Sequence, residues 1–309
     1  MNTRVLVLGE ALVDVVQQAG AEAPTEHPGG SPLNVAVGLA CLDHPVDLAT
    51  WIGRDDRGSR LRQVMDGAGV GLVEGSDAAV STPIALAQVD ADGRASYTFE
   101  LEWRLPPLGV DDLANYGHLH TGSFAATLAP GGDAVVDAVA TVRGRATVSY
   151  DPNVRPALMG APELVRARIE GLVAAADVVK VSDEDIEWLY PDTIEDNVIR
   201  AWAASGPALV VVTRGPEPVK AMLALDGELR EVDRPAVDVV DTVGAGDSFM
   251  AGLLSALLDA GLLGSPEAAA SLRVATWDEV APAIDQGVRT SGVTVGQAGA
   301  YAPTRLELS

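Results

Sequence analysis

The sequence predicts an α/β fold, with a mostly parallel central sheet, helices on both of its faces and one small additional β-sheet. Short apolar runs rich in β-branched residues alternate with helical stretches along most of the chain, which is typical of parallel strands joined by crossover helices. Residues 84–102 interrupt this alternation with a hairpin pattern. The 48% hydrophobic content and the 32 glycines in 309 residues supply one large core with many tight turns, so we expect a single domain over residues 1–309.

The alternation begins at the N-terminus. Val5 to Gly9 has the composition of a buried strand, Val35 to Leu42 that of a helix, and Val46 to Ile52 that of a second strand. Polar residues follow many of the strands, and ligands of such sheets bind beyond the carboxyl ends of the strands. We therefore expect the functional site at that edge. Further strands are expected at His118 to Gly122, Ala146 to Tyr150, Val178 to Val181 and Ala208 to Thr213.

The hairpin pattern runs from Ile84 to Glu102. Alternating apolar residues flank the run Asp90-Ala91-Asp92-Gly93, and Asp-Gly is a frequent hairpin turn. This segment predicts a small inserted sheet, separate from the main one.

The acidity of the chain excludes two classes of partner. The 21 Lys and Arg residues against 44 Asp and Glu give a net charge of −23, which repels nucleic acid and anionic membrane surfaces. A site for phosphate groups would then need local positive charge from backbone amides, a metal or a few basic side chains.

Cysteine usage and apolar runs indicate the compartment. The only cysteine, Cys41, cannot form an internal disulfide, and no apolar run is long enough to cross a bilayer. The first residues lack the apolar segment of a secretory signal. We expect a cytoplasmic protein.

The strongest local signal is the run from Asp241 to Phe249, which contains Gly244-Ala245-Gly246-Asp247 and precedes a helix-forming stretch. Small residues at a helix N-terminus let free backbone amides and the helix dipole hold an anion. Asp247 would stand beside that anion and accept a proton from an attacking hydroxyl group. Taken alone, the pattern also fits a second interpretation, in which Asp247 only caps the helix and the glycines only turn the chain.

Two longer motifs resemble those of a known family. No Walker-type Gly-Lys-Ser/Thr loop is present. Residues 241–249 resemble the C-terminal signature of the PfkB, or ribokinase-like, carbohydrate kinases, and residues 29–36 with 52–58 resemble their N-terminal signature. The resemblance covers essentially the whole chain. It implies a ribokinase-like, Rossmann-type three-layer sandwich with a small β-lid, formed by about residues 14–29 and 84–103.

The resemblance also implies how phosphoryl transfer is arranged. ATP with Mg²⁺ is the implied donor, Asp247 is the implied catalytic base, and the amides of Gly244, Ala245 and Gly246 are the implied anion hole. Lids of this family often pair, so a homodimer through the lid is a further expectation.

Carried over by position, the sugar-binding residues are Asp14, Gly30 and Asn34. A carboxylate and an amide suit neighbouring hydroxyl groups, and a glycine allows close approach of the backbone to a sugar ring. Tyr97 and Phe99 alternate on the lid strand and are candidates for covering the sugar, with lid packing or a dimer contact as the alternative.

Arg155 belongs to the run Asp151-Pro152-Asn153-Val154-Arg155-Pro156, which resembles bacterial fructokinases of the family. We expect its guanidinium at a strand end, where it would counter phosphate charge. A surface ion pair is the alternative role.

The nucleotide is expected at Ser182, Thr213, Gly215, Gly244 and Gly246. Ser182 and Asp185 stand where the family has an Asn-x-x-Glu motif, so we expect Asp185 to reach magnesium through water, with an exposed acidic helix start as the alternative. Thr213-Arg214-Gly215 resembles the start of the family's nucleotide loop, but Pro218 replaces its second glycine.

Two further ion sites are suggested by residue pattern. Asp241 and Thr242, with Gly299-Ala300, match a region that often holds a monovalent cation in the family, so potassium activation is an expectation. His118 and His120 lie on one face of an expected strand, but they lack a third ligand at useful spacing. Packing in the core or the cleft is therefore the preferred interpretation of the two histidines.

The substrate expected from the resemblance is D-fructose, phosphorylated by ATP, commonly at the 6-hydroxyl. The closest alternative is 2-keto-3-deoxygluconate, for whose carboxylate Arg94 and Arg104 are the nearby cations. A sugar-binding protein without catalysis is a third interpretation, and the intact Gly-Ala-Gly-Asp run argues against it.

Overall fold

The computed structural model describes residues 3–21, 23–89 and 95–309. In these residues the main sheet has nine strands in the order β13-β12-β11-β10-β9-β8-β1-β4-β5. Its neighbouring strands are parallel from β11 to β5, while β12 and β13 form an antiparallel edge. The strands are β1 (Val5–Leu8), β4 (Val46–Ala49), β5 (Gly71–Leu72), β8 (His118–Gly122), β9 (Thr147–Asp151), β10 (Val178–Ser182), β11 (Leu209–Arg214), β12 (Glu217–Leu223) and β13 (Leu229–Val232).

The central strands are buried on both faces because their side chains alternate between two hydrophobic clusters. In β1, Val5 and Val7 belong to one cluster, whereas Leu6 and Leu8 belong to the other. This double burial explains why the strands are continuous apolar runs in the sequence.

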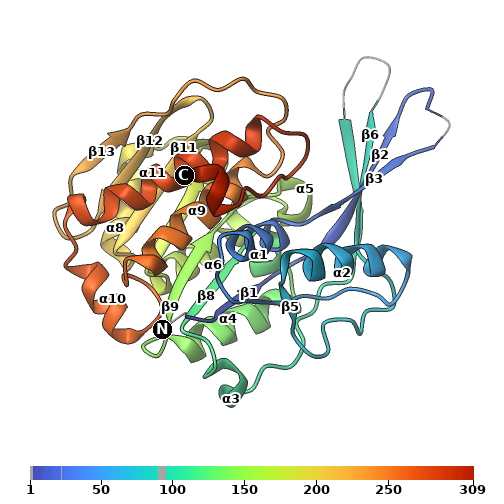
Figure 1. Ribbon diagram of the computed structural model, residues 1–309, viewed down its shortest axis with the longest axis horizontal. Helices are drawn as coiled ribbons and strands as arrows, with labels where there is room; N and C mark the ends of the chain where they lie inside the picture. Colours follow the sequence, from blue (N-terminus) through green and yellow to red (C-terminus); the bar gives the residue numbers. More distant parts are fainter. Residues whose placement is uncertain (1–2, 22, 90–94) are drawn as a thin grey trace.

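Two sets of helices cover the sheet, as Figure 1 shows. One cluster lies under α1 (Ser31–Cys41), α2 (Asp56–Ala68), α9 (Ala245–Asp259), α10 (Pro266–Arg273) and α11 (Trp277–Val295). The other lies under α3 (Val110–Leu113), α4 (Gly131–Val142), α5 (Pro156–Met159), α6 (Pro162–Ala175), α7 (Asp183–Leu189) and α8 (Glu195–Ser205). The three-layer α/β prediction is confirmed. None of the described helices is long and apolar enough to span a membrane.

A second sheet, in the order β3-β2-β6-β7, projects from the body beside α2 (Figure 1). Its strands are β2 (Leu12–Gln18), β3 (Thr25–Gly29), β6 (Ile84–Val89) and β7 (Ala95–Glu100). The antiparallel register pairs Ile84 with Glu100 and Val89 with Ala95, so the predicted hairpin is present. The turn predicted at residues 90–93 lies outside the described residues.

The antiparallel edge formed by β12 and β13 was not among the expected strands. Its register joins Leu209 of β11 to Leu223 of β12, and β12 then pairs with β13. Polar and charged residues interrupt its alternation because this edge is partly exposed, and such strands give a weak sequence signal. The edge matters for the site because the turn between β11 and β12 reaches the cavity described below.

Candidate active site

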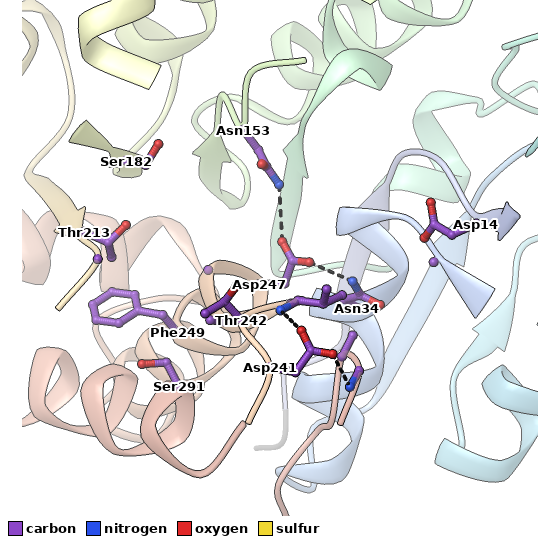
Figure 2. Close-up of a pocket in the computed structure, with 18 of the residues that line it drawn as sticks. Asp14, Asn34, Asn153, Ser182, Thr213, Asp241, Thr242, Asp247, Phe249 and Ser291 are labelled. Atoms are coloured by element: carbon purple, nitrogen blue, oxygen red, sulfur yellow. Dashed lines mark hydrogen bonds between the residues drawn. The ribbon is translucent and has the colours of Figure 1, made fainter. Parts of the chain in front are cut away.

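A cavity of about 920 Å³ opens at the carboxyl ends of the central strands. Residues of the second sheet line one side of it, and the N-terminus of α9 and residues of α11 line another. Figure 2 shows Asp247 near the middle, Asp14 on one side, and Thr213, Phe249 and Ser291 on the other. This is the position in which open α/β sheets bind their ligands.

Asp247 is a buried carboxylate, with 6% of its surface exposed, in the first turn of α9. It accepts hydrogen bonds from Ser31 Oγ at 2.7 Å, Asn34 Nδ2 at 2.8 Å and Asn153 Nδ2 at 3.3 Å. All three donors fix the orientation of the carboxylate. An isolated helix cap would need none of these distant partners, so the geometry favours a proton acceptor over a simple cap.

The turn before Asp247 depends on glycine. Gly244 caps α9 with φ of 74°, in the left-handed region, and a Cβ there would lie 2.6 Å from Cβ of Ala300. The Ala245 amide donates to the carbonyl of Thr242 at 3.2 Å. Of the three amides predicted to form the anion hole, that of Ala245 is thus engaged within the turn, while all three residues line the cavity.

Lys180 and Asp151 form a buried ion pair next to this turn, with Nζ and Oδ2 2.9 Å apart. Burial raises the pKa of Asp151 to about 6, although Lys180 opposes the shift. Burial lowers the pKa of Lys180, but Asp151 and neighbouring carboxylates outweigh it, and the net shift is upward. The pair is therefore ionised at neutral pH. A Cβ on Gly246 would lie 2.9 Å from Lys180 Nζ, so this cation adjoins the helix N-terminus.

Asp14, a residue of β2, lines the side of the cavity opposite Thr213 and Ser291. Burial raises its pKa, whereas the charges of Arg155 and His27 lower it. The carboxylate lies over Gly29, where a Cβ would approach Asp14 Oδ2 to 2.1 Å. Gly29 lines the cavity. Gly30, the predicted residue, does not line the cavity, and a Cβ there would lie 2.5 Å from the carbonyl oxygen of Glu10.

Arg155 lines the cavity, and it is connected to Asp247 through the side chain of Asn153. Its Nη1 donates to Asn153 Oδ1 at 2.6 Å, and Asn153 Nδ2 in turn donates to Asp247. Asn153 has φ of 38°, an uncommon backbone conformation for a residue with a side chain. None of the ion pairs among the described residues includes Arg155, which argues against a surface ion pair as its role.

Phe99, one of the two aromatic residues considered for covering the sugar, packs within the protein instead. Phe99 is half-buried against the hydrophobic cluster that contains Leu6 and Leu8, and it does not line the cavity. The side chain of Tyr97 lies outside the part of the chain that the structure describes. Val16, His27 and Ala87 of the second sheet line the cavity instead.

Ser182 and Asp185 form a capping box at the start of α7. Asp185 N donates to Ser182 Oγ at 3.1 Å, while the carboxylate of Asp185 accepts from Val154 N at 2.9 Å and Ser182 N at 3.4 Å. Both residues line the cavity. The carboxylate is buried rather than exposed, so the alternative of an exposed acidic helix start holds only for Asp183 and Glu184 beside it.

Thr213 and Gly215 line the end of the cavity near α11, as expected for a nucleotide site. Gly215 turns the chain between β11 and β12 with φ of 50°, and Pro218 already belongs to β12. The carbonyl of Pro218 accepts from Arg214 Nε at 2.8 Å. The glycine-rich loop is replaced here by a short hairpin turn.

Asp241 links the two loops at which a monovalent cation was expected. Its carboxylate accepts from Val243 N at 3.0 Å and from Gly299 N at 2.9 Å. These backbone hydrogen bonds lower its pKa. Thr242 and Ala300 also line the cavity, so the structure brings all four expected residues together.

The two strand histidines are packing residues. His118 contacts Thr147 Oγ1 at 2.8 Å and Ser149 Oγ at 2.9 Å, and His120 contacts the same Ser149 hydroxyl at 2.9 Å. Burial lowers the pKa of each imidazole to about 3, which keeps both neutral. In the described ranges, no group of three or more His, Cys, Asp or Glu residues is placed to hold a metal ion.

The comparison with protein families agrees with this geometry. The model of the pfkB family of carbohydrate kinases matches residues 2–305. The chain belongs to this family. A fructokinase of Klebsiella pneumoniae is 32% identical to this carbohydrate kinase over 269 residues, which are 85% of this chain and 87% of that protein.

Solved structures show the same fold. A fructokinase double mutant of Vibrio cholerae O395, with fructose, ADP and potassium bound, has a TM-score of 0.80 and 26% identity, covering 99% of this kinase and 97% of that chain. An aminoimidazole riboside kinase of Salmonella enterica, with aminoimidazole riboside and an ATP analogue, has a TM-score of 0.79 and 25% identity, covering 99% and 98%. The ribokinase-like fold is thereby confirmed.

Several residues of this carbohydrate kinase escaped the sequence analysis. Lys180 is a charged residue inside an apolar strand, which is a signal that could have been used. Ser31 and Asn153 lie inside motifs that the sequence analysis used, but their contact with Asp247 could not be predicted, because it spans 216 and 94 residues of chain. Arg234 lies in an irregular segment with no periodicity, yet it lines the cavity.

Proposed function

We propose that this carbohydrate kinase transfers the terminal phosphoryl group of ATP to the 6-hydroxyl of D-fructose. The observation that carries the proposal is the position of Asp247, which stands in the cavity between Asp14 on one side and Thr213 and Ser291 on the other, in the first turn of a helix whose N-terminus suits an anion. The fructokinase relatives support fructose as the acceptor.

The residues divide the reaction between them. Asp14 and Asn34 hold sugar hydroxyls, and Asp247 accepts the proton of the attacking hydroxyl. The N-terminus of α9, with Lys180 beside it, favours the negative charge of the transferred group. Ser31, Asn34 and Asn153 keep the carboxylate aligned before the substrate arrives.

The start of α7 fits a magnesium ion held largely by water and nucleotide phosphates. Asp183 and Glu184 offer carboxylates at the cavity wall, whereas the oxygens of Asp185 are engaged by backbone amides. Magnesium commonly uses one or two protein carboxylates in this way. When bound, it would neutralise phosphate charge. We retain Asp185 as an orienting residue, with contact to the ion through water.

A potassium ion between Asp241 and the loop of Gly299 and Ala300 belongs to the same proposal. The potassium-bound Vibrio cholerae fructokinase supports it, as does the hydrogen bond that joins the two loops here. We further propose a cytoplasmic enzyme, in keeping with its single cysteine, and a homodimer joined through the second sheet.

The two arginines considered for the carboxylate of 2-keto-3-deoxygluconate give that alternative no support. Arg104 is held by Glu102 at 2.7 Å, and it does not line the cavity. Arg94 lies outside the described residues. Arg155 lines the cavity near Asp14 without an ion-pair partner among the described residues, so it is the cation that a carboxylate substrate would meet, and the substrate screen decides between the two acceptors.

A substrate screen tests the proposal. Purified enzyme is assayed for ADP release with MgATP and fructose, 2-keto-3-deoxygluconate or aminoimidazole riboside, and the product is identified by phosphorus NMR. The proposal expects the highest kcat/KM with fructose and a 6-phosphate product. Turnover of another acceptor together with no turnover of fructose would refute the assignment of the substrate. Binding of a sugar without turnover of any acceptor would support a sugar-binding protein.

A further inference from the structure

Arg234 is a cation in the part of the cavity wall that Gly215 and Ser291 also form. It follows β13, lines the cavity and is half-buried. Its Nη1 donates to the carbonyl of Gly215, and its Nη2 donates to Ser291 Oγ at 3.1 Å. The guanidinium therefore joins the β11–β12 turn, the segment after β13, and α11 at one point on the cavity wall.

None of the ion pairs found among the described residues includes Arg234. Arg214, the last residue of β11, provides a contrast, because its Nη2 lies 2.8 Å from Glu231 and it does not line the cavity. Burial lowers the pKa of Arg234, and no carboxylate opposes this shift. In a chain with a net charge of −23, a half-buried cation without a carboxylate partner leaves local positive charge at the cavity wall.

The position of Arg234 relative to Asp247 indicates which part of the donor it meets. Figure 2 places Thr213 and Ser291, which flank this region, on the opposite side of Asp247 from Asp14. The transferred phosphoryl group must lie beside Asp247, and Lys180 lies next to the same helix N-terminus. The nucleoside half of ATP then extends toward Thr213, Ser291 and Arg234.

We propose that Arg234 binds the nucleoside half of ATP, with its guanidinium plane stacked on the purine. This inference rests on the proposed function. Two of the guanidinium nitrogens are already held by Gly215 and Ser291, so its plane is oriented before the nucleotide binds. Phe249, on the same side of the cavity, supplies an apolar neighbour for the base.

The test compares Arg234→Met and Arg234→Lys with Arg214→Met, whose arginine is paired outside the cavity. We expect Arg234→Met to raise the KM for ATP and the dissociation constants of ADP and adenosine by about tenfold, the size of one stacking contact. The kcat at saturating ATP and the KM for the sugar should stay unchanged. Arg234→Lys should behave like Arg234→Met, because an ammonium lacks the planar fork. Arg214→Met should bind ADP as the wild type does.

Three results would overturn the inference. Weaker ADP binding with unchanged adenosine binding would place Arg234 at the phosphates. Full recovery of affinity in Arg234→Lys would show that charge alone suffices. Unchanged ADP and adenosine binding in Arg234→Met would remove the contact altogether. Failure of the wild type to bind ADP would instead contradict the proposed function, so calorimetry on the wild type separates the two claims.

Discussion

Asn34 Nδ2 donates to Asp247 Oδ2 at 2.8 Å, although 213 residues separate the two in the chain. The contact joins the first turn of α1 to the first turn of α9, and these two helices pack on the same face of the main sheet. The two sequence signatures of the family thus meet at one carboxylate. The orientation of the Asp247 carboxylate therefore depends on how α1 and α9 pack, and replacing its hydrogen-bond donors one at a time tests this dependence.

Ser31 and Asn34 both donate a hydrogen bond to Asp247, but only Asn34 also lines the cavity. A hydrogen bond to a charged group is worth about 1.5–3 kcal/mol, so loss of alignment should cost roughly tenfold or more in rate. Ser31→Ala should lower kcat and leave the KM for fructose unchanged. Asn34→Ala should lower kcat and also raise that KM. Steady-state kinetics with both variants checks the split, and an equal rise of KM in Ser31→Ala would contradict it.

Removal of Lys180 should destabilise the fold because it leaves Asp151 as an uncompensated buried charge. Breaking one partner of a buried pair costs about 3–5 kcal/mol. We expect Lys180→Met to lose unfolding free energy of that order in a urea titration. The double variant Asp151→Asn with Lys180→Met should recover most of the stability but not the activity, because the cation beside the helix N-terminus is still missing. Recovery of both would mean that Lys180 is only structural.

Much of the fold could be predicted, because strands buried on both faces and the hairpin pattern are local features. The position of Asp247 in the first turn of a helix was also predictable, since a small-residue turn before a helix is a local signal. The roles of Lys180, Asn153 and Arg234 were not, because each depends on a partner that only the folded chain brings near. Gly30 was expected from its place in a motif and Phe99 from alternation along its strand, and neither pattern shows which residues line the cavity; the structure leaves both outside the lining, and Phe99 packs as its alternative role expects.

Glu10 gives the fold a pH dependence. Burial raises its pKa from 4.5 to about 8, against hydrogen bonding and the charge of Arg155. The folded state therefore keeps a proton that the unfolded chain releases above pH 4.5, and stability falls as pH rises through this window to about 8. The slope for one group is at most about 1.4 kcal/mol per pH unit.

Glu10→Gln removes this titration. We expect the variant to match the wild type near the lower end of the window and to be more stable near its upper end. Thermal unfolding across the window measures the difference, with the exposed Glu163→Gln as a control that leaves the slope unchanged. Parallel curves for wild type and Glu10→Gln would show that Glu10 is not protonated in the folded protein.

Replacement of Asp247 by Asn tests the central claim most directly. The amide keeps the size of the side chain but cannot accept the proton of the sugar hydroxyl. We expect kcat for fructose phosphorylation to fall by roughly 10²–10⁴-fold, while calorimetry shows fructose and ADP bound within a few-fold of wild-type affinity. A kcat close to that of the wild type, with the same product, would contradict the role of Asp247 as the base.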